Sequence, residues 1–267
     1  MGQASNLRRR LNVLRRRSRR SRKSMTVIEH LDELRSRLIK SVVAFVVISV
    51  AAFFFFEPIL KFLLEPLCEL PAELLGPQGC RLIGTSPTEP FQVRLKVTAL
   101  AGIVFSAPVW LYQIWAFVTP GLTTKEKRYA IPFVVVSALL FAIGTTFAYL
   151  TLRPGLRFLI ALGEGQITSF FQADRYLNFV GFMFLGFGAA FELPLLLFFL
   201  GLADVVSVDA LRHHRRSAIV AITFIAAIVT PSQDPYTMML MAVPLYLMYE
   251  LVILLLRIIK RRRAASI

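Results

Sequence analysis

The sequence predicts an all-α membrane protein with six transmembrane helices, and three observations support this fold class. Hydrophobic residues make up 56% of the 267 residues and charged residues only 18%, a more apolar balance than that of ordinary water-soluble domains. Several apolar runs approach the roughly 20 residues that a helix needs to cross a bilayer. Lysine and arginine gather in alternate loops between these runs, as expected of a chain that crosses a membrane repeatedly.

Six apolar segments are predicted to span the membrane. They cover residues 39–57, 95–118, 130–152, 176–200, 217–230 and 237–256. The fifth segment is short, and Pro231, Ser232 and Pro235 separate it from the sixth. No cleavage site of small residues follows the first segment, so we interpret it as a span and not as a removed signal peptide.

The basic residues predict the orientation of the spans. Of the 31 lysines and arginines, 24 lie in residues 8–40, 125–128, 212–216 and 257–263, all on one side of the predicted spans. Cytoplasmic segments carry such an excess, so we expect both termini to be cytoplasmic. Anionic lipids attract each basic residue near the surface by about 1 kcal/mol. We therefore expect the basic tails to contact anionic lipids, with nucleic-acid binding as the less favoured alternative.

The chain is predicted to have three parts. Residues 1–24 combine dense positive charge with few apolar residues, which is typical of a disordered basic arm. Residues 25–257 form the membrane domain, whose first helix is expected to begin at Thr26, because Thr26 and Glu29 have the spacing of a capping box. Residues 258–267 form a basic cytoplasmic tail.

Three loops are predicted on the external side. The first, residues 58–90, contains the amphipathic segment "PILKFLLEPL" and is long enough to form a structural cap. The second covers residues 153–175, and the third is a tight turn at residues 231–235. Cys68 and Cys80 both lie in the first loop, where an oxidising environment favours a disulfide between them. Two unpaired thiols remain the alternative.

Proline is expected to bend four of the predicted spans. Pro108, Pro132, Pro194 and Pro244 lie within apolar segments. Each removes a backbone hydrogen-bond donor, which neighbouring helices must compensate. We therefore expect a bent and uneven bundle with a concave face.

The sequence lacks the motifs of common catalytic and cofactor sites. It contains no H-E-x-x-H, G-x-S-x-G or P-loop pattern. Its three histidines are not arranged with cysteines or carboxylates as metal ligands. We therefore expect neither an enzyme nor a bound cofactor or metal, and the candidate functional residues are acidic.

Glu192 is the most unusual acidic residue because it interrupts the apolar run "GFGAAFELPLLLFFL". A carboxyl group within a membrane needs a partner, a wet cavity or a proton. Pro194 deprives the carbonyl group of Ala190 of its helical donor, and a protonated Glu192 is expected to donate to that carbonyl. Two roles stay open: a hydrogen bond between helices, or a polar docking point for a partner.

Glu33 and Glu126 are acidic residues of the basic, cytoplasmic side. Glu33 precedes Arg37 by four residues, so a structural ion pair on one helix face is the simplest interpretation. Glu126 is the one acidic residue of the loop at residues 125–128. Two carboxylates beside apolar surface also suit a ligand that carries arginines followed by an apolar stretch, since guanidinium groups pair bidentately with carboxylates.

Five motifs occur in an order and spacing that resemble a known family. They are "HLDELRSRL", "PVWLYQIWAFVTPGLTTKEKR", "FGAAFELPLLL", "TPSQDP" and "AVPLYLMYELV". Together they resemble the TatC family, the signal-peptide receptor of twin-arginine translocases, over about residues 26–257. The resemblance implies a cup-shaped receptor in the cytoplasmic membrane of a prokaryote, which exports folded proteins with the proton-motive force. The implied partners are twin-arginine signal peptides, the single-span proteins TatA and TatB, and further copies of the receptor.

The resemblance also implies roles for individual residues. Glu33 and Glu126 match the carboxylates that receive the arginine pair, and Phe117 and Arg35 belong to the same binding site. Glu192, together with Pro194, matches a buried carboxylate that faces a neighbouring Tat subunit.

Two residues of the external loops, Pro66 and Asp234, match family positions as well. The chain departs from the family pattern at Lys127, where arginine is common, and in its basic arm. The pair of Cys68 and Cys80 is not a general feature of the family either.

Two functions of other classes stay open. A proton-coupled transporter of small molecules, with Glu192 as its proton site, predicts solute flux by this chain alone, and the absence of internal repeats counts against it. A structural assembly factor predicts no specific peptide binding.

Overall fold

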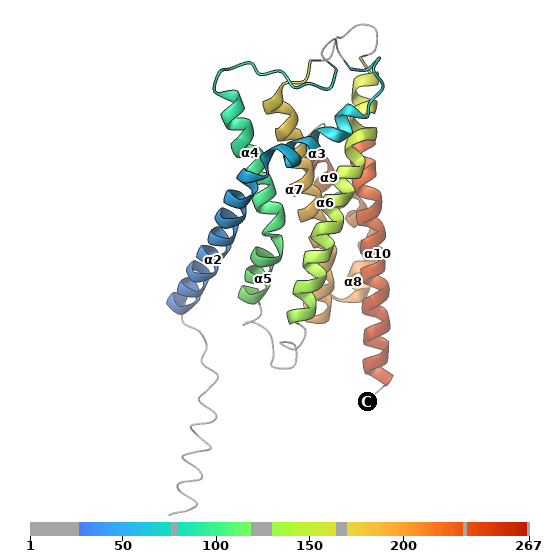
Figure 1. The fold of residues 1–267 in the computed structure, drawn as a ribbon. Helices are drawn as coiled ribbons and strands as arrows, with labels where there is room; N and C mark the ends of the chain where they lie inside the picture. The colour runs from blue at the N-terminus through green and yellow to red at the C-terminus, as the bar shows by residue number, and fades with distance from the viewer. Residues whose placement is uncertain (1–26, 76–78, 119–129, 164–169, 232–233, 266–267) are drawn as a thin grey trace, which may run out of the picture.

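The structure, a computed structural model, describes residues 27–75, 79–118, 130–163, 170–231 and 234–265 (Figure 1). In these residues the regular structure is helical, apart from one isolated bridge between Ile83 and Gln172. The helices of the described residues are α2 (Val27–Phe54), α3 (Phe56–Cys68), α4 (Glu89–Phe105), α5 (Ala107–Val118), α6 (Ala130–Ala161), α7 (Ala173–Leu202), α8 (Val208–His213), α9 (Arg215–Val229) and α10 (Pro235–Ala265).

The lengths and composition of these helices confirm the prediction of an all-α membrane protein. Among the described residues, α2, α6, α7 and α10 are each long and apolar enough to cross a membrane. The pair of α4 and α5, which is bent by 52°, counts as a fifth when the two helices are taken together as one span. The predicted fifth span, residues 217–230, corresponds to α9. This helix has only 15 residues and is about 22 Å long at 1.5 Å per residue, which is shorter than the roughly 30 Å hydrocarbon layer.

The second predicted span, residues 95–118, is a broken helix. The break lies at Ser106, whose backbone N–H donates to the carbonyl oxygen of Gly102 at 3.0 Å. The indole N–H of Trp110 satisfies the carbonyl oxygen of Ile103 at 3.1 Å. Pro108 lies in the first turn of α5, where its missing N–H is tolerated. The bend therefore precedes the proline to which the sequence assigns it.

The prediction that a loop begins at Arg153 is wrong. α6 continues through Pro154 to Ala161. Proline inside a helix removes one hydrogen bond and typically costs about 3 kcal/mol. Leu152 and Leu156, on either side of this proline, are buried in the main core cluster, and the burial of two leucines offsets that loss.

α6 and α7 approach each other closely, with backbone atoms in contact. A Cβ atom added to Gly144 would lie 2.7 Å from the carbonyl oxygen of Phe187 and 3.1 Å from the Cα of Gly188. A Cβ atom added to Gly188 would lie 2.6 Å from the ring of Phe141. Helices in membranes approach closely at such small residues, so these two glycines set the distance between α6 and α7.

An apolar groove of about 890 Å³ lies on the side of the bundle that α2 borders. Its walls come from α2 to α7 and include Ala52, Phe62, Val104, Phe141 and Thr145. Figure 1 shows α2 at one edge of the bundle and α3 crossing from the end of α2 toward α6. The groove agrees with the expected concave face.

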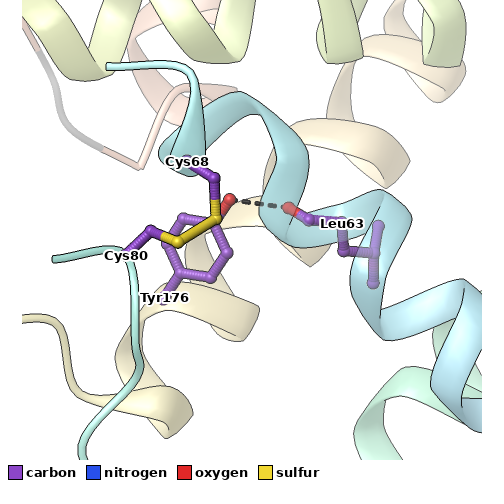
Figure 2. The surroundings of a disulfide bond; sticks show 4 residues. All are labelled: Leu63, Cys68, Cys80 and Tyr176. Atoms are coloured by element: carbon purple, nitrogen blue, oxygen red, sulfur yellow. Dashed lines mark hydrogen bonds between the residues drawn. A yellow bond between two sulfur atoms is a disulfide. The ribbon is translucent and has the colours of Figure 1, made fainter. Parts of the chain in front are cut away.

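A disulfide marks one end of the bundle, which we call the disulfide end. Cys68, the last residue of α3, is bonded to Cys80, and their Cα atoms are 4.9 Å apart. The hydroxyl group of Tyr176 on α7 donates to the carbonyl oxygen of Leu63 on α3 at 2.7 Å (Figure 2). Three residues after Cys80, Ile83 donates to Phe171 at 2.8 Å and accepts from Ala173 at 3.1 Å. The disulfide therefore links α3 to a segment that is itself paired with the start of α7.

Glu89 joins the same segment to α7. Its carboxylate accepts hydrogen bonds from the backbone N–H groups of Thr85 and, at 3.3 Å, Ser86. It also accepts from the backbone N–H of Asp174 on α7 at 3.1 Å. Lys96 of α4 forms an ion pair with the side chain of Asp174. The disulfide end is thus tied together by covalent, backbone and ionic contacts.

Replacement of both cysteines by serine, Cys68→Ser with Cys80→Ser, is expected to lower the unfolding temperature in detergent. A disulfide that closes a loop of about 15 residues contributes about 3 kcal/mol by restricting the unfolded chain, and these cysteines are 12 residues apart. Thermal unfolding measured by circular dichroism checks this. An unchanged unfolding temperature for the double variant, under conditions in which the native disulfide is intact, would contradict it.

Gly144→Ala is expected to destabilise the protein, whereas Gly181→Ala on α7 is expected to be neutral or slightly stabilising. Overfilling a packed site costs about 1–3 kcal/mol. The added methyl group at position 181 meets its nearest neighbour, a methyl group of Leu100, at 4.0 Å, and alanine is the better helix former. The unfolding temperatures of the two variants in detergent test this prediction. Equal values would disprove the tight contact at Gly144.

Candidate functional site

The candidate site lies where α2 begins and α5 ends, at the end of the bundle opposite the disulfide end (Figure 1). We call this the Glu33 end. His30, Glu33 and Arg37 are spaced to share one face of α2. The ring of His30 stacks on the ring of Phe117 from α5, with centroids 4.3 Å apart and planes 18° apart. This stack joins the two helices beside Glu33.

Glu33 forms the ion pair with Arg37 that the spacing of the two residues predicts. The Nε group of Arg37 donates to Oε1 of Glu33 at 3.1 Å, and Nη2 of Arg37 bonds to the same oxygen atom. Both side chains are about one-fifth exposed, at 20% for Glu33 and 21% for Arg37. The second oxygen, Oε2, is buried and has no hydrogen-bond partner in the structure of the described chain. One half of the carboxylate is therefore satisfied and the other half is not.

The other residues of the predicted binding site are only partly placed. Glu126, the second carboxylate, lies in residues 119–129, outside the described residues. Arg35 is exposed on α2. Phe117 is half-buried against His30. Sequence reasoning missed His30 as a site residue, although it opens the motif "HLDELRSRL", because a contact between α2 and α5 leaves no local pattern in the sequence.

Glu192 contacts a neighbouring helix. Its Oε2 atom accepts a hydrogen bond from the Ser137 hydroxyl group of α6 at 2.6 Å. Its Oε1 atom is buried, and no hydrogen bond to it occurs in the described structure. The expectation that Glu192 donates to the carbonyl group of Ala190 is therefore wrong, because the side chain points from α7 toward α6. Pro194, two residues further on, is buried.

The two predicted residues of the external loops have structural contacts. Pro66 is buried inside α3 and leaves the carbonyl group of Phe62 without its helical donor. The hydroxyl group of Tyr149 reaches that carbonyl oxygen at 3.4 Å and the carboxylate of Glu65 at 3.0 Å.

Asp234 is buried at the start of α10. Its Oδ1 atom accepts from the backbone N–H of Thr237 at 2.8 Å. This is the contact of a helix N-cap, and Pro235 follows at the first helical position, where proline is favoured. Asp234 therefore begins the last helix.

Metal ligation finds no support in the described residues, which contain no group of three histidine, cysteine or acidic side chains that could hold an ion. The functional groups at the Glu33 end are a carboxylate with one oxygen that lacks a hydrogen bond and, beside it, the rings of His30 and Phe117. Such an arrangement can bind a cationic, hydrogen-bond-donating group.

The family of the chain follows from comparison with known proteins. The model of the family described as Sec-independent protein translocase protein (TatC) matches residues 29–244. The chain belongs to the TatC family. The matched range contains Glu33, Phe117, Glu192, Pro66 and Asp234.

Two relatives named Sec-independent protein translocase protein TatC illustrate this similarity. The one from Frankia casuarinae is 43% identical over 237 residues, which are 86% of this chain and 65% of the relative. The one from Aquifex aeolicus is 39% identical over 242 residues, which are 90% of this chain and 98% of the relative. The chain therefore spans less than two thirds of the first relative but nearly all of the second.

A crystal structure of the twin-arginine translocase receptor TatC in DDM has a similar fold. The TM-score is 0.72 at 40% sequence identity, and the match covers 85% of this chain and 99% of the crystallised one. The all-α architecture described above is thus that of the TatC family.

Ser137→Ala is expected to destabilise the protein by about 1–3 kcal/mol, because it leaves Glu192 without a hydrogen bond at either oxygen. Glu192→Gln keeps an acceptor for the hydroxyl group and is expected to change stability little. In the double variant Ser137→Ala with Glu192→Leu, part of the loss should be regained, because no polar group stays unpaired. Unfolding temperatures in detergent of the native chain, Ser137→Ala, Glu192→Gln, Glu192→Leu and the double variant test this. If the effects of the single substitutions simply added up, the two side chains would not be coupled.

Proposed function

We propose that this chain is the receptor subunit of a twin-arginine protein translocase and binds the twin-arginine signal peptides of folded proteins. The observation that carries the proposal is the half-satisfied carboxylate of Glu33, at one end of a membrane bundle with the TatC fold. Neither the sequence nor the described structure suggests a catalytic group at this site, so binding is the activity that its geometry supports.

The orientation that the proposal requires has two independent supports. A disulfide persists on the oxidising side of a membrane, so Cys68 and Cys80 favour an external disulfide end. The opposite end is where α2 begins and α10 ends (Figure 1). The predicted loops and tails that adjoin these helix ends in the sequence hold most of its basic residues, which favours the cytoplasm. Signal peptides of proteins made in the cytoplasm would then meet Glu33 before export. The membrane is accordingly the cytoplasmic membrane of a prokaryote.

Recognition of the arginine pair would depend on charge and shape. A guanidinium group offers two parallel N–H donors to a carboxylate, whereas the ammonium group of lysine acts as a compact point charge. Glu33 supplies one carboxylate, and Glu126 is proposed as the second. Leu34 and Leu38 are exposed apolar side chains of α2 near Glu33. They provide a surface for the apolar stretch that follows the arginines.

The remaining partners are proposed on the same basis. Glu192 and Pro194 would form a polar docking point for the single-span proteins TatA and TatB, since one oxygen of Glu192 stays unpaired after the Ser137 contact. Further copies of the receptor would associate with it, and anionic lipids would contact the basic tails. Because the sequence has no nucleotide-binding motif, the proton-motive force would drive transport.

Glu33→Gln is expected to weaken binding of a fluorescent twin-arginine signal peptide by about tenfold or more, since a hydrogen bond to a charged group contributes about 1.5–3 kcal/mol. Asp32→Asn is the matched control, because it removes the same charge from an exposed neighbour on α2. Fluorescence anisotropy with the purified protein in detergent measures both variants. The same titration with a Lys-Lys peptide should give much weaker binding to the native protein.

Two results would contradict the proposed function. One is equal affinity of the native protein for the Arg-Arg and Lys-Lys peptides. The other is equal weakening by Glu33→Gln and Asp32→Asn, which would indicate a general effect of charge and no specific site at Glu33.

A further inference from the structure

The carboxylate of Glu33 is already occupied by a guanidinium group of the chain itself. Arg37 directs both Nε and Nη2 at the single atom Oε1 of Glu33. A guanidinium group is the group that the proposed ligand would bring to this position. The chain therefore contains an internal counterpart of its proposed ligand.

The unpaired Oε2 atom of Glu33 can accept a ligand's donor only after the carboxylate or Arg37 moves. Oε1 is bonded to Arg37, and Oε2 is buried without a hydrogen-bond partner in the described structure. A guanidinium group from a ligand must therefore displace Arg37 from Oε1, or rotate the carboxylate so that Oε2 is uncovered. Both routes disturb the contact between Glu33 and Arg37. Among the ion pairs of the described residues, Arg37 takes part in this one alone, so its displacement gives up an ion pair that the ligand must replace.

We propose that Arg37 determines the specificity of the site by competing with the ligand for Glu33. The inference rests on the proposed function and adds a residue to it. An incoming arginine replaces the displaced contact with an equivalent one, because its guanidinium group has the same fork of donors. An incoming lysine does not, because its ammonium group is strongly hydrated and offers no planar pair of donors. The resident arginine thus acts against the wrong ligand, which is one of the two ways in which a protein discriminates between ligands.

The position of Arg37 allows a ligand to displace it from Glu33. Arg37 is on the same helix as Glu33, one turn further on, so the pair needs no contact from another helix. Both side chains remain partly exposed, and a long arginine side chain can move its charged head into water. Displacement of Arg37 therefore leaves α2 and its contact with α5 through His30 and Phe117 in place.

The test compares Arg-Arg and Lys-Lys signal peptides on four proteins in detergent: the native chain, Arg37→Gln, Arg37→Lys and Arg216→Gln. Arg216 is an exposed arginine of α9 and controls for the loss of one positive charge. We expect Arg37→Gln to bind the Lys-Lys peptide about tenfold more tightly than the native chain does, the effect of one charge-assisted hydrogen bond. Affinity for the Arg-Arg peptide should rise less, so that the ratio of the two affinities falls. Arg37→Lys should lie between, and Arg216→Gln should match the native chain.

Three results would overturn the inference. An unchanged ratio in Arg37→Gln would mean that Arg37 does not compete. Weaker binding of the Arg-Arg peptide by Arg37→Gln would mean that Arg37 positions Glu33 for the ligand. An equal change in Arg216→Gln would reduce the effect to net charge. The proposed function fails as well if the native chain binds both peptides with equal affinity and Glu33→Gln leaves these affinities unchanged. If the preference of the native chain for the Arg-Arg peptide depends on Glu33, only the role of Arg37 fails.

Discussion

The close contact of α6 with α7 at Gly144 and Gly188 is the constraint on which much of the remaining structure depends. Because the helices nearly touch there, the Ser137 hydroxyl group can reach Glu192, and a carboxyl group within the apolar part of α7 gains a partner. The start of α7 in turn holds Tyr176 and Asp174, which anchor α3 and the loop beyond the disulfide. α7 is therefore the helix to which both the intramembrane polar contact and the disulfide end are attached.

The two ends of the bundle are held in different ways. At the disulfide end, a covalent bond, a backbone bridge and the buried carboxylate of Glu89 restrain the same segment. At the Glu33 end, the contact between α2 and α5 in the described residues includes a stack of two rings, and the charged pair lies within α2 alone. A charged pair that needs no contact from a second helix suits a surface that must exchange one guanidinium partner for another. The contacts at the disulfide end would keep the bundle assembled during that exchange.

Composition and local spacing were sufficient to predict much of this protein from its sequence. Apolar content and length predict the membrane helices, and the spacing of four residues predicts the pair of Glu33 and Arg37, since both signals are local. The extension of α6 past Pro154 could not be predicted, because the burial of Leu152 and Leu156 compensates for the proline. Ser137 as the partner of Glu192 could not be predicted either, since 55 residues separate them and only helix packing brings them together. The role of Asp234 as a helix N-cap could have been predicted from the sequence, because Asp234, Pro235 and Thr237 have the spacing of a helix start.

The central claim is that the Glu33 end of α2 receives the arginine pair of a signal peptide. Site-specific photocrosslinking tests it most directly, with a benzophenone side chain in place of Leu34, which is 43% exposed beside Glu33, and in place of Phe170, which is 57% exposed near the disulfide end. In membrane vesicles that expose the cytoplasmic side, the account predicts a crosslink to an Arg-Arg precursor from position 34, none from position 170, and loss of the crosslink with a Lys-Lys precursor. Equal crosslinking from both positions, or a crosslink from position 34 that the Lys-Lys precursor retains, would contradict it.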